Sequence, residues 1–141
     1  MTLAMDVAEL QGFLGEAFPQ VSDDFTVLEA TPEHLRVALA PAERHLRPGG
    51  TVSGPTMFAL ADVAMYLAIL ARIGPEALAV TTNCSIDFMR KPPAGAPMTC
   101  TARLLKLGRV LAVGDALIEA EGLGGPVARA SLTYSIPPKA G

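Results

Sequence analysis

One segment constrains the fold more than any other part of the sequence: from Met57 to Ala71 almost every residue is apolar, on whichever face of a helix it would lie. Ser53 is suited to cap such a helix and Pro55 to its first turn, because proline has a fixed φ and lacks the N–H that would be unpaired there. A helix that is apolar on all sides is enclosed by protein or by lipid. We therefore predict a long enclosed helix over residues 54–72.

Asp62, in the middle of this segment, decides between the two environments. A carboxylate at the centre of a lone membrane span is costly, so we predict a core helix and no membrane partner. The positions three and four residues away hold no cation; they are Phe58, Ala59, Met65 and Tyr66. Asp62 therefore lies on a solvent-facing strip, or is bonded by backbone or hydroxyl groups of another strand, or serves a ligand or a reaction.

Around this helix the sequence predicts short strands joined by turns. Six runs carry strand patterns, over residues 25–30, 34–40, 78–90, 98–107, 110–120 and 126–136. Short turns between successive strands imply antiparallel pairing. A further helix is expected within residues 1–20, ended by Pro19. The chain is predicted to form a single α+β domain over residues 1–141, with a six-stranded antiparallel sheet curled around the central helix.

Composition excludes several classes of protein. Half of the residues are hydrophobic and the net charge is only -3, which argues against disorder. Acidic residues outnumber basic ones 14 to 11, which argues against a nucleic-acid partner. Cys84 and Cys100 stand in no CxxC motif and the chain has two histidines, so we expect reduced thiols and no metal site. The first residues lack the pattern of a secretory signal, and we expect a cytoplasmic protein.

The start of the central helix is a second candidate for chemistry. Gly54 lets a ligand approach the backbone, and the first N–H groups of a helix carry a partial positive charge that suits an oxyanion. Plain capping by Ser53 is the alternative reading of the same residues. Ser53 does not stand in a G-x-S-x-G turn and neither histidine is placed as its base, which argues against a serine hydrolase.

Taken together, these features resemble a known family. A long loop, a helix with a small-residue start, an acid nine residues after Ser53 and four antiparallel strands are similar to the hotdog-fold acyl-CoA thioesterases of the PaaI type. The resemblance runs from about Phe25 to Ile136 and includes the segments 86–92 and 104–109. It implies an antiparallel sheet of five to six strands wrapped around a long helix, and hydrolysis of an acyl-CoA thioester. Coenzyme A would enter as part of the substrate, with no other cofactor, in a homodimer or homotetramer whose sites cross the dimer interface.

The resemblance also assigns roles to individual residues. The catalytic carboxylate falls on Asp62, as general base or nucleophile, and the backbone oxyanion donor falls on Gly54. The hydroxyl that holds the attacking water from the neighbouring subunit falls on Thr81, with Asn83 close by on the same strand face. Two positions depart from the family pattern. The usual His-Gly-Gly begins here with Ser53, and the asparagine often found six residues ahead of that histidine is Arg47.

The substrate is expected to contact two further groups of residues. An acyl or aryl pocket is predicted from apolar and aromatic side chains, namely Phe58, Leu60, Tyr66 and Phe88. Coenzyme A carries phosphates, so its binding requires local positive charge despite the acidic total, and the candidates are Arg47, Arg90, Lys91, Lys106 and Arg109. Ser53 and Asn83 complete the predicted binding set.

Two other functions fit the same residues. The chain could be a non-catalytic protein that binds acyl-CoA or another small ligand, having kept the fold and lost the histidine. A hotdog dehydratase is the third reading; such enzymes generally pair an acid with a histidine, and His45 is the candidate.

Overall fold

The computed structural model describes residues 3–138, so residues 1–2 and 139–141 of the predicted domain lie outside the described part. Its helices and strands are α1 (Val7–Ala17), β1 (Phe25–Ala30), β2 (Leu35–Leu39), β3 (Leu46–Arg47), β4 (Thr51–Val52), α2 (Gly54–Ile73), β5 (Val80–Phe88), β6 (Met98–Leu107), β7 (Leu111–Ala120) and β8 (Pro126–Ser135). Two short 3-10 turns, η1 (Ser22–Asp24) and η2 (Glu43–His45), complete the set. The predicted strands are confirmed to within two residues at each end.

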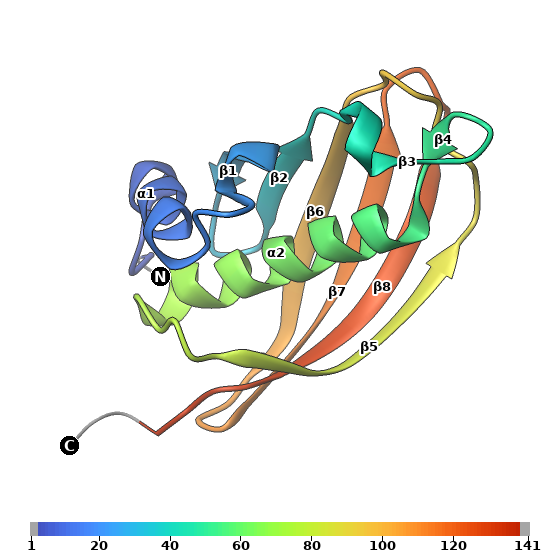
Figure 1. The fold of residues 1–141 in the computed structure, drawn as a ribbon. Coiled ribbons are helices and arrows are strands. Elements are labelled where there is room, and N and C mark those ends of the chain that lie inside the picture. The colour runs from blue at the N-terminus through green and yellow to red at the C-terminus, as the bar shows by residue number, and fades with distance from the viewer. Residues whose placement is uncertain (1–2, 139–141) are drawn as a thin grey trace.

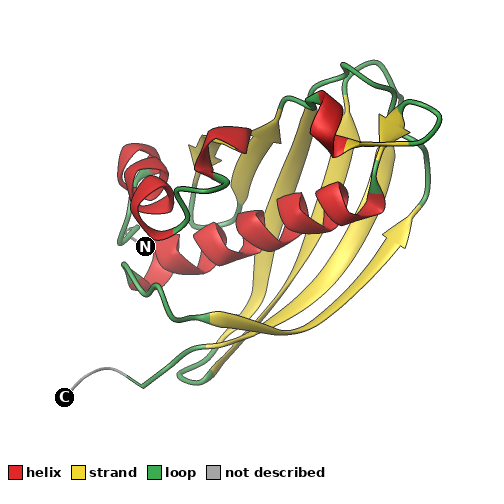
Figure 2. Ribbon diagram, viewed as in Figure 1, coloured by secondary structure: helices red, strands yellow, loops and turns green. Residues whose placement is uncertain are grey.

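Six of the strands form one sheet in the order β1-β2-β6-β7-β8-β5, and all neighbours in it are antiparallel. The sheet curves around α2, which lies along its inner face (Figures 1 and 2). The prediction of an α+β hotdog fold is therefore confirmed. The long loop expected before the central helix is more ordered than predicted, because it contains η2 and the small β3–β4 hairpin.

The core forms between α2 and the inner face of the sheet. Eleven of the 20 residues of α2 are buried, so the helix has the environment of a core helix, although its length and its mean hydropathy of 1.7 would also suit a membrane span. Strand β8 alternates, with Ala130, Leu132 and Tyr134 buried between more exposed neighbours. This alternation directs every second side chain of β8 toward α2.

The N-terminal helix α1 covers one end of the sheet. Asp6 and Glu9 form a capping box at its start, and Leu10 and Leu14 are fully buried beneath it. The side-chain amide of Gln11 accepts a hydrogen bond from Val27 N at 2.7 Å and donates one to Phe25 O at 3.0 Å, so α1 occupies the outer edge of β1. Within residues 3–138, the opposite edge strand, β5, pairs only with β8, and its outer edge is open.

Candidate active site

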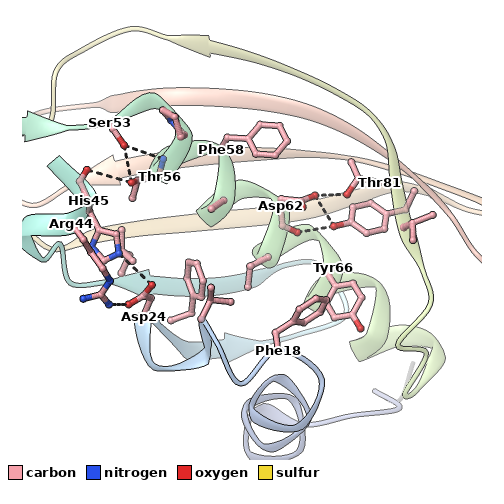
Figure 3. A pocket seen from close by; sticks show the side chains of 18 of the residues that line it. Phe18, Asp24, Arg44, His45, Ser53, Thr56, Phe58, Asp62, Tyr66 and Thr81 are labelled. Atoms are coloured by element: carbon pink, nitrogen blue, oxygen red, sulfur yellow. Dashed lines mark hydrogen bonds and ion pairs between the residues drawn. The ribbon is translucent and has the colours of Figure 1, made fainter. Parts of the chain in front are cut away.

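A cavity of about 670 Å³ runs along α2, between that helix, the N-terminal segment and the start of β5 (Figure 3). Most of its surface is apolar, and five of the seven aromatic residues of the chain line it: Phe18, Phe25, Phe58, Tyr66 and Tyr134. The polar side chains in its wall include Asp62 and Thr81 near one end and Asp24, Arg44 and His45 near the other. Such a cavity, apolar with a few polar groups, has the character of a small-molecule site.

Asp62 lies in the wall of this cavity and is held by two hydroxyl groups. Thr81 of β5 donates to Asp62 Oδ1 at 2.5 Å, and the phenol of Tyr134 donates to the same oxygen at 2.7 Å. The phenol also lies 2.9 Å from the carbonyl oxygen of Asp62. Hydroxyls of neighbouring strands thus bond the carboxylate, as one of the three sequence-based readings expected. Thr81 belongs to the same chain as the Asp62 that it contacts, so the expectation that this hydroxyl comes from the neighbouring subunit is wrong.

The second oxygen of the carboxylate, Oδ2, has no hydrogen-bond partner among residues 3–138. The described part of the chain also contains no side-chain oxygen or nitrogen that is both buried and unpaired, so Oδ2 keeps some exposed surface, and its residue lines the cavity. A carboxylate with one oxygen fixed and the other free can accept a proton from a water molecule or attack an electrophilic carbon. The geometry therefore presents a single reactive oxygen to the cavity.

Tyr134 was missed as a site residue by the sequence analysis, which assigned it only to the predicted strand over residues 126–136. It is only 2% exposed. Burial raises the pKa of its phenol far above the ordinary value, and the nearby charge of Asp62 raises it further, so the hydroxyl remains a donor at any physiological pH. The available signal was the phenol itself, because a buried tyrosine hydroxyl needs a hydrogen-bond partner.

At the start of α2, Ser53 acts as the N-cap. Its hydroxyl accepts from Thr56 N at 3.3 Å and lies 2.8 Å from Thr56 Oγ1, so the capping role accounts for this side chain. The N–H of Gly54 has no partner within residues 3–138 and stays free to donate. A Cβ at Gly54 would lie 3.2 Å from the ring of Phe88, which shows how closely the ring covers this backbone.

Comparison with known proteins gives this geometry a context. The profile of the thioesterase superfamily matches residues 49–127, a segment that contains Gly54, Asp62 and Thr81. The chain belongs to the thioesterase superfamily. A solved structure of a candidate thioesterase from Silicibacter sp. TM1040 is 56% identical, with a TM-score of 0.90, over 98% of this chain and 96% of that one. The similarity therefore extends across both chains and includes α1.

Two further relatives agree with this assignment. A variant of the phenylacetic acid degradation protein PaaI from Thermus thermophilus is 31% identical over 84% of this chain and 99% of that one, with a TM-score of 0.73. A candidate esterase from Deinococcus radiodurans is 36% identical over 87 residues, which span 62% of this chain and 57% of that protein. The predicted resemblance to PaaI-type hotdog thioesterases is confirmed.

Within this thioesterase fold, Thr81 and Asn83 do not share a strand face, and that prediction is wrong. Strand β5 has a bulge between them: Thr81 pairs with Tyr134 of β8, but Asn83 pairs with the preceding residue, Thr133. Directly paired residues point to the same side of a sheet, and consecutive residues point to opposite sides. Asn83 is therefore exposed on the outer face, away from Asp62.

Only some of the predicted pocket residues line the cavity. Phe58 and Tyr66 line the cavity, and the Tyr66 hydroxyl donates to Ala77 O at 3.2 Å. Leu60 does not line it, because this residue is fully buried in the core. Phe88 packs over Gly54 and does not line the cavity.

The predicted basic residues are not brought together within one chain. Arg47 is exposed in the β3–β4 hairpin and does not line the cavity. Arg90 and Lys91 are exposed just after β5, close to β4, where Pro92 O accepts from Val52 N. Arg109 lies in the β6–β7 turn, at the opposite end of the sheet from Arg90 and Lys91. About eight strand residues separate the two ends, which is about 25 Å at the rise of a β-strand. A single phosphate-binding patch in one subunit can include only some of them.

At the other end of the cavity, Asp24 joins η1 to η2. It pairs with the guanidinium of Arg44, and its Oδ2 lies 3.3 Å from His45 Nε2. His45 Nδ1 accepts from Ala42 N at 2.8 Å, so both ring nitrogens are occupied by partners. This arrangement does not leave His45 free to act as the base that a dehydratase would require.

Proposed function

We propose that the protein hydrolyses an acyl-CoA thioester to the free acid and coenzyme A, with Asp62 as the catalytic carboxylate. The observation that carries this proposal is the asymmetric binding of the carboxylate: Oδ1 accepts from two hydroxyls, while Oδ2 faces an apolar cavity. Membership of the thioesterase superfamily supports the reaction class.

In the general-base form of the mechanism, Asp62 Oδ2 takes a proton from water as the water oxygen bonds to the thioester carbonyl carbon. The C–S bond then breaks, the thiolate leaves with the proton, and the acid remains. In the nucleophilic form, Oδ2 bonds to the same carbon, the thiolate leaves, and water hydrolyses the resulting anhydride. The structure supports both forms equally, since both need one accessible oxygen.

The carbonyl oxygen needs a donor as negative charge develops on it, and we assign this role to the Gly54 N–H. Gly54 and Asp62 are eight residues apart on one helix, about 12 Å at the rise of an α-helix, so one carbonyl group cannot contact both in the same chain. The complete site therefore requires Gly54 of one subunit with Asp62 and Thr81 of another. This requirement favours a homodimer, or a homotetramer built from such dimers.

The open edge of β5 supports self-association. In the described part of the chain this strand pairs only with β8. Four apolar side chains on and beside it are between 47% and 72% exposed: Leu78, Val80, Phe88 and Met89. An unpaired strand edge flanked by apolar side chains is prone to pair with another chain. We propose that a second copy of the chain covers it.

For coenzyme A itself, we propose that Arg90 and Lys91 contact the phosphates. They are exposed and lie near the start of α2, where the oxyanion donor Gly54 also lies. A hypothetical thioesterase protein from Streptococcus pneumoniae that has this fold, 19% identical with a TM-score of 0.75, was solved with coenzyme A. The case for this chain depends on its own residues.

The proposed chemistry needs only a carboxylate, a hydroxyl and a backbone N–H, with no metal or further cofactor, and we propose that it takes place in the cytoplasm.

Hydrolysis of a panel of short, long and aryl acyl-CoAs, followed by release of free thiol, tests the proposal. Asp62→Ala and Asp62→Asn should abolish most of the turnover while the fold is retained. Asp87→Asn is the matched control, because this carboxylate pairs with Arg129 on the outer surface. Turnover that survives loss of the Asp62 carboxylate would overturn its role. Absence of turnover by the wild type, with acyl-CoA still raising the melting temperature, would establish a binding protein instead.

A further inference from the structure

We infer that Tyr134 is a positioning residue of this site: its hydroxyl holds the Asp62 carboxylate in the orientation that directs Oδ2 alone toward the substrate. The inference rests on the proposed function. It goes beyond it by assigning a role to a residue that touches Asp62 and lies on a different strand from Thr81.

The first step of the argument is the contact itself. The single hydroxyl of Tyr134 lies 2.7 Å from Asp62 Oδ1 and 2.9 Å from Asp62 O, so it links the side chain of Asp62 to its own backbone. An Asp side chain has two rotatable bonds, and fixing Oδ1 relative to the carbonyl oxygen restricts both of them. With Oδ1 fixed, the position of Oδ2 follows from the planar geometry of the carboxylate.

The second step is the rigidity of the hydroxyl. Tyr134 is buried in β8, which pairs on one side with β7 and on the other with β5. Its cross-strand partners are Ala112 and Thr81, and its ring lies 6.3 Å from that of Tyr66. A side chain on an internal strand is held more firmly than one on a loop, which suits it to place a catalytic group.

The third step is the register of the sheet. Thr81 and Tyr134 are direct cross-strand partners, so their side chains point to the same side and reach the same carboxylate oxygen. The bulge in β5 follows Thr81 and leaves this pair intact. One residue pair of the sheet therefore supplies both donors to the carboxylate.

Tyr134→Phe is the test, because it removes the hydroxyl and keeps the ring. We expect kcat on the best acyl-CoA to fall about 10- to 100-fold, as for loss of a hydrogen bond to a charged group, with KM changed less than about twofold. Thr133→Val is the matched control: it removes a neighbouring hydroxyl of β8 that points to the opposite side and should change neither quantity.

A second measurement separates this inference from the proposed function. The melting temperatures of the wild type, Tyr134→Phe, Asp62→Ala and the double variant form a cycle that measures the contact without substrate. Coupling in the cycle together with the kinetic changes would support the role. An active wild type whose Tyr134→Phe variant keeps its kcat would overturn the positioning role alone. A wild type inert on every acyl-CoA would overturn the proposed function, and this role with it, even if the coupling is present.

Discussion

The Thr81 hydroxyl lies 2.5 Å from Asp62 Oδ1 and so links the open edge strand β5 directly to the enclosed helix α2. The same strand carries apolar side chains on its exposed surface, where we propose that a second subunit pairs. A shift of β5 would therefore alter the hydrogen bonding of the catalytic carboxylate. In this arrangement, subunit pairing and the geometry of Asp62 depend on each other through one strand.

Thr81→Val should lower kcat about tenfold or more, because it removes a donor to the carboxylate and the hydroxyl proposed to hold water, and leaves the side-chain volume nearly unchanged. Thr81→Ser keeps the hydroxyl and should retain most of the activity. Thr82→Val is a suitable control, since the Thr82 hydroxyl donates to Thr133 O on the exposed side of β5. Steady-state hydrolysis by the three variants measures the difference. Equal rates for Thr81→Val and Thr81→Ser would contradict the role of this hydroxyl.

Gly114→Ala should destabilise the fold strongly. A Cβ at this position of β7 would overlap the carbonyl oxygen of Arg103 and lie 2.7 Å from Met65 Sδ in the core. Because one obstacle is backbone, a rotamer change of Met65 cannot relieve both contacts, and we expect a loss of about 1–3 kcal/mol or more in the free energy of unfolding. Denaturant unfolding measures it.

Gly15→Ala provides the comparison for that variant. No atom lies within 4 Å of a Cβ at Gly15, which is exposed in helix α1, so alanine should raise the free energy of unfolding by about 0.5–1 kcal/mol. If Gly114→Ala and Gly15→Ala changed the free energy of unfolding by the same amount and sign, the close approach of α2 to β7 at Gly114 would be contradicted.

The two cysteines should differ in reactivity. Burial raises the pKa of Cys100 to about 12, so its thiol should react with a disulfide reagent only after unfolding. Cys84 is less buried, and its pKa is raised by burial and then by the charge of Asp62. Removing that charge lowers the pKa and increases the thiolate fraction, so Asp62→Asn should label at Cys84 roughly two- to tenfold faster near pH 8. Cys84→Ser, which leaves only Cys100, should not label while folded; rapid labelling of that variant, or an unchanged rate in Asp62→Asn, would contradict the assignment.

Much of the fold could be predicted because its signals are local. The apolar segment around Asp62 could only be an enclosed helix, and the clean alternation through Leu132 and Tyr134 could only be a half-buried strand. The turns between strands are rich in glycine and proline, which set the strand ends to within two residues. Asp62 itself was identifiable because a lone carboxylate in such a helix needs a partner or a role.

The details of the site could not be predicted, because they depend on contacts between distant segments. The bulge that separates the faces of Thr81 and Asn83 has no distinct sequence signal. Its effect is large, because one extra residue in a strand shifts every later side chain to the other face. The contact of Tyr134 with Asp62 joins residues 72 positions apart. The pairing of His45 with Asp24 depends in the same way on how η1 packs against η2.

Phe18→Ala should change substrate preference more than stability. Phe18 ends α1, is 36% exposed and packs edge-on against Tyr66, with ring centroids 5.4 Å apart, in the wall of the cavity (Figure 3). If the acyl group occupies this cavity, loss of the ring removes an apolar contact worth about 0.5–1.5 kcal/mol, and KM should rise about two- to tenfold for acyl groups long enough to reach it. Short acyl groups should be affected least. KM across the acyl-CoA panel measures this dependence on length.

Phe13→Ala distinguishes loss of an apolar contact in the cavity wall from a loss of stability of helix α1. Phe13 also lies on α1 and packs against the core, but it is absent from the cavity wall, so its removal should lower the melting temperature without altering the order of preference among acyl-CoAs. If Phe18→Ala raised KM equally for all acyl lengths, or if Phe13→Ala reproduced its pattern, the ring would act only through the stability of α1. A length-dependent change confined to Phe18→Ala would place the acyl group between α2 and the N-terminal segment.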